Sequence, residues 1–303
     1  MTFARSLIVV FLVAITAIAS GQSVADRIWV QPLPRIRTQS NWYPRAIETI
    51  DGRIVDFDNE KMRIVIEGDE VETLIAASRV IWVQPGEVSA VQKAAIENFD
   101  AKRYAEALQA LPGLLKERPP VWRQQWLTMM AANASRETLR GDIAIELVSQ
   151  IDRRGLPPLV TAWFPIAWQN GSQPAAIVQA AQKRLQDDSP AVRLVAASWL
   201  LSSADRSDAS SVLNLLAGQT DRPEIASLAR CVLWRTATPP EVAASVDKWQ
   251  QELNQLPMVL QTGPMTGLAD KFESAGQIEA AKVLRLQLEL TPIHPSPLVP
   301  SSK

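Results

Sequence analysis

Few residues in this 303-residue chain could carry out nucleophilic, acid–base or metal chemistry. There is one cysteine, Cys231, and one histidine, His294. A single cysteine excludes an internal disulfide and a CxxC site, and a single histidine excludes metal sites built on paired histidines. His294 lies in a Pro- and Ser-rich stretch, which is a poor support for a general base. We therefore expect no Ser-His-Asp triad, and we expect Cys231 to be a buried structural thiol.

Paired carboxylates are the remaining route to catalysis, because two acidic side chains can hydrolyse a glycosidic bond without histidine. The acidic residues are scattered, and Glu48, Asp51 and Asp56 come nearest to a cluster, where hairpin turns commonly place acids. The segment Gly263–Gly267 lacks the spacing of a phosphate-binding loop and predicts a loop followed by a helix start. We expect no enzyme, no cofactor and no metal site, with a carboxylate-dependent glycoside hydrolase as the least favoured alternative.

Charge and composition limit the remaining classes of function. The formal net charge is -1, so no basic excess indicates nucleic acid as a partner. A chain of this length can bury about 75% of its unfolded surface, so it needs neither disulfides nor a metal to fold. Tryptophan is frequent, with 10 residues against 2 tyrosines, and serves either as core filler or as a surface anchor.

Residues 1–25 have the features of a secretory signal peptide. Arg5 supplies positive charge, Leu7–Ala19 is a nearly continuous apolar run, and Ala17–Ala19 and Ser23–Ala25 offer small-x-small cleavage sites. The apolar run is short for a membrane span of about 20 residues, so we favour cleavage over a retained anchor. Export without cysteine pairs indicates the periplasm or outer envelope of a bacterium, or a secreted product.

Residues 26–86 have the composition of a small β-module. Alternating and β-branched runs predict five strands, at Arg27–Gln31, Arg53–Phe57, Lys61–Ile66, Val71–Ile75 and Arg79–Val83. Asp51–Gly52 predicts the turn before the second strand, and residues 32–50 form a long first loop. The order resembles that of an SH3-like barrel, which implies that the first and last strands lie side by side. The sequence Ile-Trp-Val-Gln-Pro, at Ile28–Pro32 and Ile81–Pro85, would then mark two neighbouring strands.

The long first loop contains the best candidate for a partner-binding site. Basic and aromatic side chains are interleaved over Arg35–Arg45, with Trp42, Tyr43 and Arg45 as the candidate contacts. Of the two interpretations of this loop, we favour the one in which its aromatic side chains pack inward on the β-module.

From Glu87 onward the apolar residues recur with the period of amphipathic helices. Phe99–Leu108, followed by Pro119, resembles the middle and end of a tetratricopeptide repeat (TPR), although it lacks the usual glycine in the turn. The pattern returns in Leu268–Pro292 with a glycine at Gly276. Small alanines, Ala107 and Ala281, lie where the two helices of each repeat would cross.

Between these copies the helical signals are less regular. We expect Trp122–Ser135 and Ile143–Arg153 to form a helix pair joined through Gly141–Asp142. Asp187–Pro190 is a start signal for a helix at Ala191–Leu201, and further starts are predicted at Asp208, Arg222–Pro223 and Pro239–Pro240. We expect about ten helices in antiparallel pairs over residues 87–292, an α-solenoid with TPR-like ends, and a disordered tail at 293–303. The seven tryptophans of this region are expected to be core, with a concave binding groove as the alternative: Trp122, Trp126, Trp163, Trp168, Trp199, Trp234 and Trp249.

The fold class expected is therefore mainly α, with a TPR-like solenoid behind an SH3-like β-barrel. The whole mature chain is similar to uncharacterised exported bacterial proteins with this organisation. The resemblance implies a non-enzymatic scaffold of the cell envelope that binds a protein or peptide on a helical-repeat surface. The alternative is a protein that binds cell-wall polysaccharide by stacking tryptophan on sugars.

Overall fold

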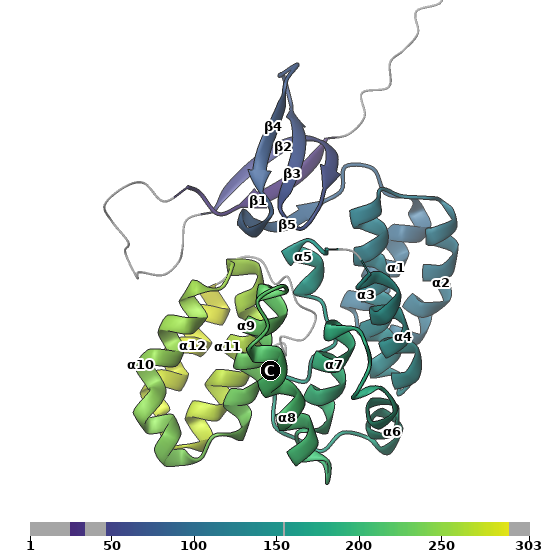
Figure 1. Ribbon diagram of the computed structural model, residues 1–303. Helices are drawn as coiled ribbons and strands as arrows, with labels where there is room; N and C mark the ends of the chain where they lie inside the picture. The colour runs from purple at the N-terminus through teal and green to yellow at the C-terminus, as the bar shows by residue number, and fades with distance from the viewer. Residues whose placement is uncertain (1–24, 34–46, 154, 291–303) are drawn as a thin grey trace, which may run out of the picture.

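The computed structural model describes residues 25–33, 47–153 and 155–290, and every side chain in these ranges except that of Leu115. Its first part is a five-stranded antiparallel sheet (Figure 1). The strands are β1 Asp26–Val30, β2 Glu48–Phe57, β3 Lys61–Ile66, β4 Glu72–Ala76 and β5 Val80–Gln84, with the 3-10 turn η1 at Ala77–Arg79. The sheet order is β4-β3-β2-β1-β5. The first and last strands are neighbours, as predicted, and Trp29 lies opposite Trp82.

The prediction of a turn at Asp51–Gly52 is wrong, because both residues lie inside β2. Gly52 pairs with Asp26 of β1 on one side and with Ile66 of β3 on the other. A Cβ atom on Gly52 would lie 2.5 Å from the carbonyl oxygen of Val65. The glycine is therefore required by the close approach of a neighbouring strand rather than by a turn.

The described residues from Ala90 onward contain twelve α-helices, so the chain is mainly helical, as predicted. They are α1 Ala90–Asp100, α2 Tyr104–Lys116, α3 Val121–Glu137, α4 Gly141–Ile151, α5 Pro158–Thr161, α6 Ala175–Arg184, α7 Pro190–Leu200, α8 Arg206–Ala217, α9 Pro223–Leu233, α10 Pro239–Gln255, α11 Met258–Ser274 and α12 Ile278–Leu290, with the 3-10 turn η2 at Trp234–Thr236. α8 begins at Arg206 rather than at Asp208, whereas helices begin at Pro190, Pro223 and Pro239, at or within one residue of the predicted starts. At the first of these, Ser189 Oγ accepts a hydrogen bond from the Val192 N–H at 3.1 Å, a regular N-cap.

Three helix hairpins share one turn geometry. The second residue after the first helix has a positive φ angle in each: Lys102 (60°), Leu139 (63°) and Gly276 (78°). In each turn this residue and its successor donate backbone hydrogen bonds to the last turn of the helix, the pattern of a Schellman cap. A buried alanine follows five residues later in every case: Ala107, Ala144 and Ala281. The hairpins α1–α2, α3–α4 and α11–α12 are thus built alike.

The helices follow a curve around α5, and the sheet lies across the open side of that curve (Figure 1). Each of the first three helices packs on the next, α4 packs on α6 and α7, and α11 contacts α5, α9 and β5. The sheet therefore touches both an early helix, α3 through β2, and a late one, α11 through β5.

Residues 156–168, which include α5 and which we call the inner segment, fill the inside of the curve. Their large side chains are buried, including Leu159, Trp163, Phe164 and Trp168. A buried irregular backbone needs hydrogen-bond partners, and surrounding side chains supply them. Asn133 Nδ2 donates to the Trp163 carbonyl, Trp199 Nε1 to the Pro165 carbonyl, Arg235 Nη1 to the Ala167 carbonyl, and Ser198 Oγ accepts from the Ala167 N–H.

The prediction that Gly263–Gly267 forms a loop and helix start is wrong, because the segment lies within α11. Cβ atoms at these two glycines would lie 2.3 Å from Trp168 Nε1 and 2.5 Å from the Trp168 carbonyl oxygen, respectively. The glycines therefore form the helix surface against which the inner segment packs.

Aromatic side chains join the sheet to the helices in one continuous core. Trp82 of β5 lies 5.9 Å from Trp126 and 6.2 Å from Trp163, measured between ring centroids. Phe57 of β2 lies 6.2 Å from Trp122 of α3. Because these rings bury large apolar areas against each other, the sheet and the helical array stabilise one another.

Candidate functional site

The candidate contacts Trp42, Tyr43 and Arg45 lie outside the described residues, so the hypothesis of a binding loop stays a prediction. The other sequence-based candidates can be located. All seven tryptophans of the helical array are buried, with at most 8% of each exposed. The interpretation of these residues as core is confirmed, and the alternative of a tryptophan-lined groove is wrong for them.

Of the residues with catalytic potential, Glu48, Asp51 and Asp56 all lie in β2, and His294 lies outside the described residues. Cys231 is buried in α9, where desolvation raises the pKa of its thiol far above the usual range. Asp51 forms an ion pair with Arg27 at 2.8 Å, and Asp56 forms one with Arg63 at 3.5 Å. Among the described residues there is no group of three or more His, Cys, Asp or Glu side chains that could hold a metal ion.

Arg235 is a buried cation with a structural role. Its guanidinium donates to the carbonyl oxygens of Ala167 and Ser198 at 2.7 and 2.8 Å. Desolvation, together with the charges of Arg136 and Arg206, lowers its pKa to about 10. The group therefore stays protonated at neutral pH and fixes the inner segment to α7.

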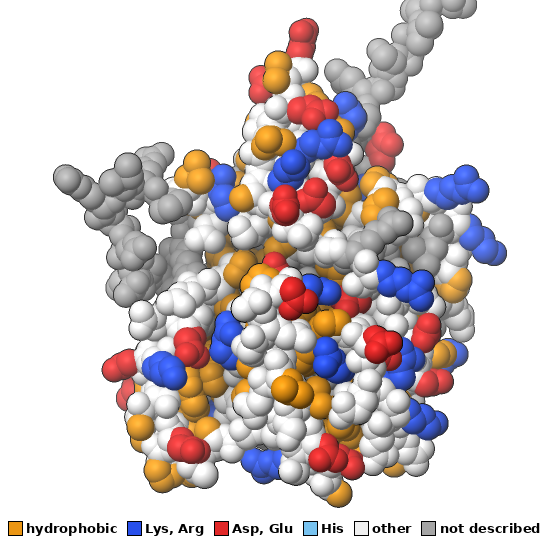
Figure 2. Space-filling model, in the orientation of Figure 1, with side chains coloured by type: hydrophobic (Ala, Val, Ile, Leu, Met, Phe, Trp, Pro, Cys, Tyr) orange, Lys and Arg blue, Asp and Glu red, His pale blue; other side chains and the backbone are white. Residues whose placement is uncertain are grey.

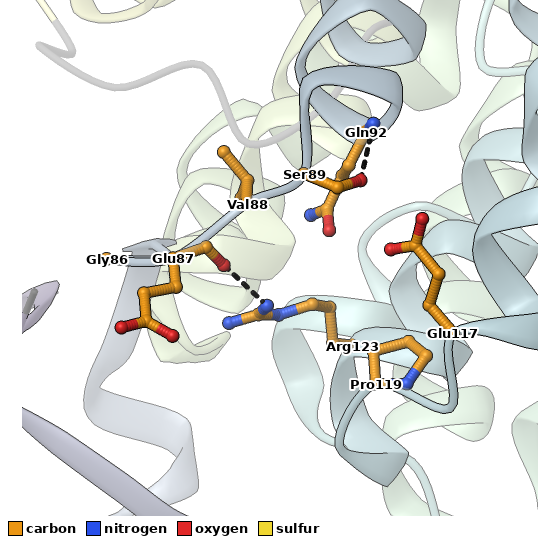
Figure 3. Close-up of a pocket in the computed structure, with 8 residues that line it drawn as sticks. All are labelled: Gly86, Glu87, Val88, Ser89, Gln92, Glu117, Pro119 and Arg123. Carbon is orange, nitrogen blue, oxygen red and sulfur yellow. Dashed lines mark hydrogen bonds between the residues drawn. The ribbon is translucent and has the colours of Figure 1, made fainter. Parts of the chain in front are cut away.

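A pocket of about 550 Å³ lies where the sheet, α1 and the α2–α3 turn meet (Figure 3). We call it the junction pocket. It is lined by Gly86, Glu87, Val88, Ser89, Gln92, Glu117, Pro119 and Arg123. Its volume is within the range of small-ligand sites, and most of its lining groups are polar.

Arg123 forms one side of the junction pocket and is held firmly. Its Nη1 donates to the Glu87 carbonyl at 2.9 Å, and its Nη2 lies 3.7 Å from Asp26 Oδ1. The guanidinium carbon lies 5.5 Å from the centre of the Trp122 ring. Burial lowers the pKa of Arg123, while Asp26 and Glu87 act in the opposite direction. The arginine thereby ties α3 to the first strand and to the segment after β5.

Gln92 and Glu117 form the opposite side of the junction pocket. Gln92 is only 3% exposed, and its Nε2 has no hydrogen-bond partner among the described residues. The Gln92 amide and the Glu117 carboxylate point into the same space beside Arg123 (Figure 3). No motif in the sequence marked these residues, since a glutamine in the first turn of a helix is ordinarily exposed.

The outer face of α12 is the second candidate surface. Ala281 and Leu284 pack inward, whereas Val283, Leu286 and Leu290 lie on the opposite side and are 41–54% exposed. Their spacing of three and four residues places them in one stripe along the helix. The sequence of α12 contains this stripe. Apolar residues lie on two faces of the helix, and only one of these faces packs on α11 in the hairpin.

The rest of the visible surface is mixed in charge. Figure 2 shows acidic and basic side chains interspersed over the sheet, where Arg63 lies between Asp56 and Glu72 at 3.5 and 3.4 Å. No described helix combines the length and the apolar character that crossing a membrane would require. Comparisons of the chain with protein-family models, curated proteins and solved structures find no match.

Proposed function

We propose that this protein is a non-enzymatic interaction protein whose α12 outer face binds a helix of a partner protein. The observation that carries the proposal is the exposed stripe of Val283, Leu286 and Leu290. Contiguous exposed apolar residues on a soluble protein mark interaction sites, and an amphipathic helix buries such a stripe well. The partner helix would lie on α12 much as α11 does on its other side.

The helical array is proposed to be a TPR-like α-solenoid. The support is the recurring hairpin with a positive φ angle at Lys102, Leu139 and Gly276 and a buried alanine five residues later. In such arrays each helix pair buries its faces on its neighbours, so the last helix offers a free face. Because the segment around α5 fills the inside of the curve, we assign partner binding to this free face rather than to a concave groove.

The sheet is proposed to be an SH3-like module. Its support is the position of β1 between β2 and β5, together with the short turn η1 before the last strand. The proposed location in the bacterial envelope rests on residues 1–25 of the sequence alone. Polysaccharide binding finds less support, since the seven tryptophans of the helical array are buried and cannot stack on sugars.

Affinity capture from a native envelope extract tests the proposal, using residues 26–303 as bait. Removing the sheet is unsuitable, because Trp82 and Phe57 complete the core of the helical array. We would instead compare the wild-type bait with Leu286→Glu on α12 and with Leu215→Glu, a control at a residue of α8 that is 68% exposed. Both changes place a charge on an exposed position, so the fold should tolerate them equally.

The proposal predicts that the wild-type chain and the Leu215→Glu control enrich the same proteins and that Leu286→Glu does not. Equal enrichment by all three baits would show that α12 is not the binding face. If no bait enriches any protein, partner binding itself loses its support.

A further inference from the structure

The junction pocket contains a polar group that the fold itself does not use. Gln92 is 3% exposed, and its Nε2 lacks a hydrogen-bond partner among the described residues. A buried donor without an acceptor destabilises a protein, and an apolar residue of similar size would avoid that cost. The terminal amide can turn about its last bond, so either of its polar atoms can face the pocket. An occupant with a hydrogen-bond acceptor would satisfy the donor.

The charges around the junction pocket favour a cationic occupant. Glu87 and Glu117 line the pocket and Asp26 lies 3.7 Å from Arg123, so three carboxylates stand against one guanidinium. Asp26 and Glu87 act on Arg123, whereas Glu117 forms no ion pair among the described residues. Its chain neighbours, Lys116 and Arg118, are exposed. The positive end of the occupant therefore belongs at Glu117, on the side away from Arg123.

We propose that the junction pocket binds the free amino terminus of a peptide. The α-ammonium group lies against the Glu117 carboxylate, and the first peptide carbonyl accepts a hydrogen bond from Gln92 Nε2. A terminal residue carries both groups within a short distance of each other, which matches a pocket where a carboxylate and an amide group lie beside one space (Figure 3). Capture of an amino terminus is a known mode of peptide recognition.

The backbone at the two contact residues is fixed before a ligand arrives. Glu117 directly follows α2, and Arg118 after it has a φ angle of 53°, ahead of the prolines at 119 and 120. Gln92 lies in the first turn of α1, where its own N–H donates to Ser89 Oγ at 3.1 Å. Preformed contacts of this kind reduce the entropy lost on binding.

This site lies at the α1–α3 end of the array and is independent of the proposed α12 face. The test is an NMR titration of residues 26–303 that follows the side-chain amide signal of Gln92. Three probes are added in turn: trialanine, N-acetyl-trialanine and N-acetyl-Ala-Lys-Ala. Acetylation removes the terminal charge, and the lysine peptide offers an ammonium group without an adjacent carbonyl.

The proposal predicts a saturable shift of the Gln92 signal with trialanine and none with the two acetylated peptides. Glu117→Gln should weaken trialanine binding by roughly tenfold or more, because it removes the charge partner of the ammonium group. Glu106→Gln, at an exposed position of α2, is the matched control and should bind normally. An equal response to the acetylated peptides, or no response to trialanine, would overturn the proposal.

A second variant separates a ligand-binding role of Gln92 from a structural one. Gln92→Leu should abolish trialanine binding and at the same time raise the midpoint of urea unfolding, because the unsatisfied amide is removed. A lowered midpoint would show that the amide serves the fold, and the assignment of Gln92 to a ligand would then be wrong.

Discussion

Lys102 and Gly276 occupy the same position in two hairpins at opposite ends of the helical array. Their φ angles are 60° and 78°, and each precedes a buried alanine, Ala107 or Ala281, by five residues. Glycine adopts a positive φ angle without strain, whereas a residue with a Cβ atom does not. The two turns therefore have the same geometry, but the backbone strain energy is higher at Lys102 than at Gly276.

The first prediction follows from this difference in cost. Lys102→Gly should raise the free energy of unfolding by about 0.5–1 kcal/mol, since relief of strain exceeds the entropy that glycine adds to the unfolded chain. Gly276→Ala should lower it by about 1 kcal/mol, although the space around Gly276 is open. Urea unfolding followed by tryptophan fluorescence measures both values.

Gly113 supplies the control for these two substitutions. It lies in α2 with no neighbouring atom within 4 Å of an added Cβ, and its φ angle is not positive. Gly113→Ala should therefore raise the free energy of unfolding by about 0.5–1 kcal/mol. If Gly276→Ala and Gly113→Ala changed stability in the same direction, the shared turn would not explain the effect.

The second prediction concerns the contact between α11 and the inner segment. Gly263→Ala would place a Cβ atom 2.3 Å from Trp168 Nε1, so the ring must move. We expect a loss of about 3 kcal/mol in the free energy of unfolding, as for other overpacked cores. Thermal unfolding by circular dichroism gives the value. An unchanged midpoint would mean that Trp168 does not pack on α11.

The third prediction concerns the tie between the sheet and α3. Asp26 accepts hydrogen bonds from the N–H groups of Ile54 and Gly86 at 3.1 and 2.9 Å and lies 3.7 Å from Arg123. Asp26→Ala leaves these donors without an acceptor and should cost about 2–3 kcal/mol of stability. Glu279→Ala, which removes an exposed ion pair with Lys282, should cost less than about 1 kcal/mol. Equal losses in the two variants would contradict the structural role of Asp26.

The fourth prediction concerns Cys231. Burial raises the pKa of the thiol, so the reactive thiolate is essentially absent from the folded protein at neutral pH. A thiol reagent should leave the native chain unmodified at pH 8 and label it stoichiometrically in denaturing urea. Rapid labelling of the folded protein would show that α9 opens or that the thiol is accessible.

Much of the fold could be predicted from local patterns, and the errors share a physical cause. Strands and helix starts depend on residues close in sequence. The alternation of polar and apolar residues therefore located the strands, and Ser-Pro or Arg-Pro pairs located the helix starts. Gly52 and Gly263 were misplaced in turns because each is required by a distant group, the Val65 carbonyl and the Trp168 ring. The joint predicted at Gly141–Asp142 is wrong, because both residues lie inside α4 and the turn falls at Leu139, where leucine replaces the expected glycine at a positive φ angle.

The candidate surfaces were harder to predict than the fold. The depth at which Gln92 lies depends on how the α2–α3 turn and the sheet meet α1, which no local pattern records. The sequence of α12 has apolar residues on two faces, yet only the structure tells which face is exposed. The loop residues Trp42, Tyr43 and Arg45 lie outside the described ranges and stay a prediction.

The central claim is that the outer face of α12 binds a partner protein, and its most direct test is a dissociation constant. A partner obtained by affinity capture would be purified and titrated with the wild-type chain, Leu286→Glu and Leu215→Glu. The account predicts that Leu286→Glu weakens binding roughly 30-fold or more, as at an interface hot spot, and that Leu215→Glu leaves it unchanged. Equal dissociation constants for the three proteins would contradict it.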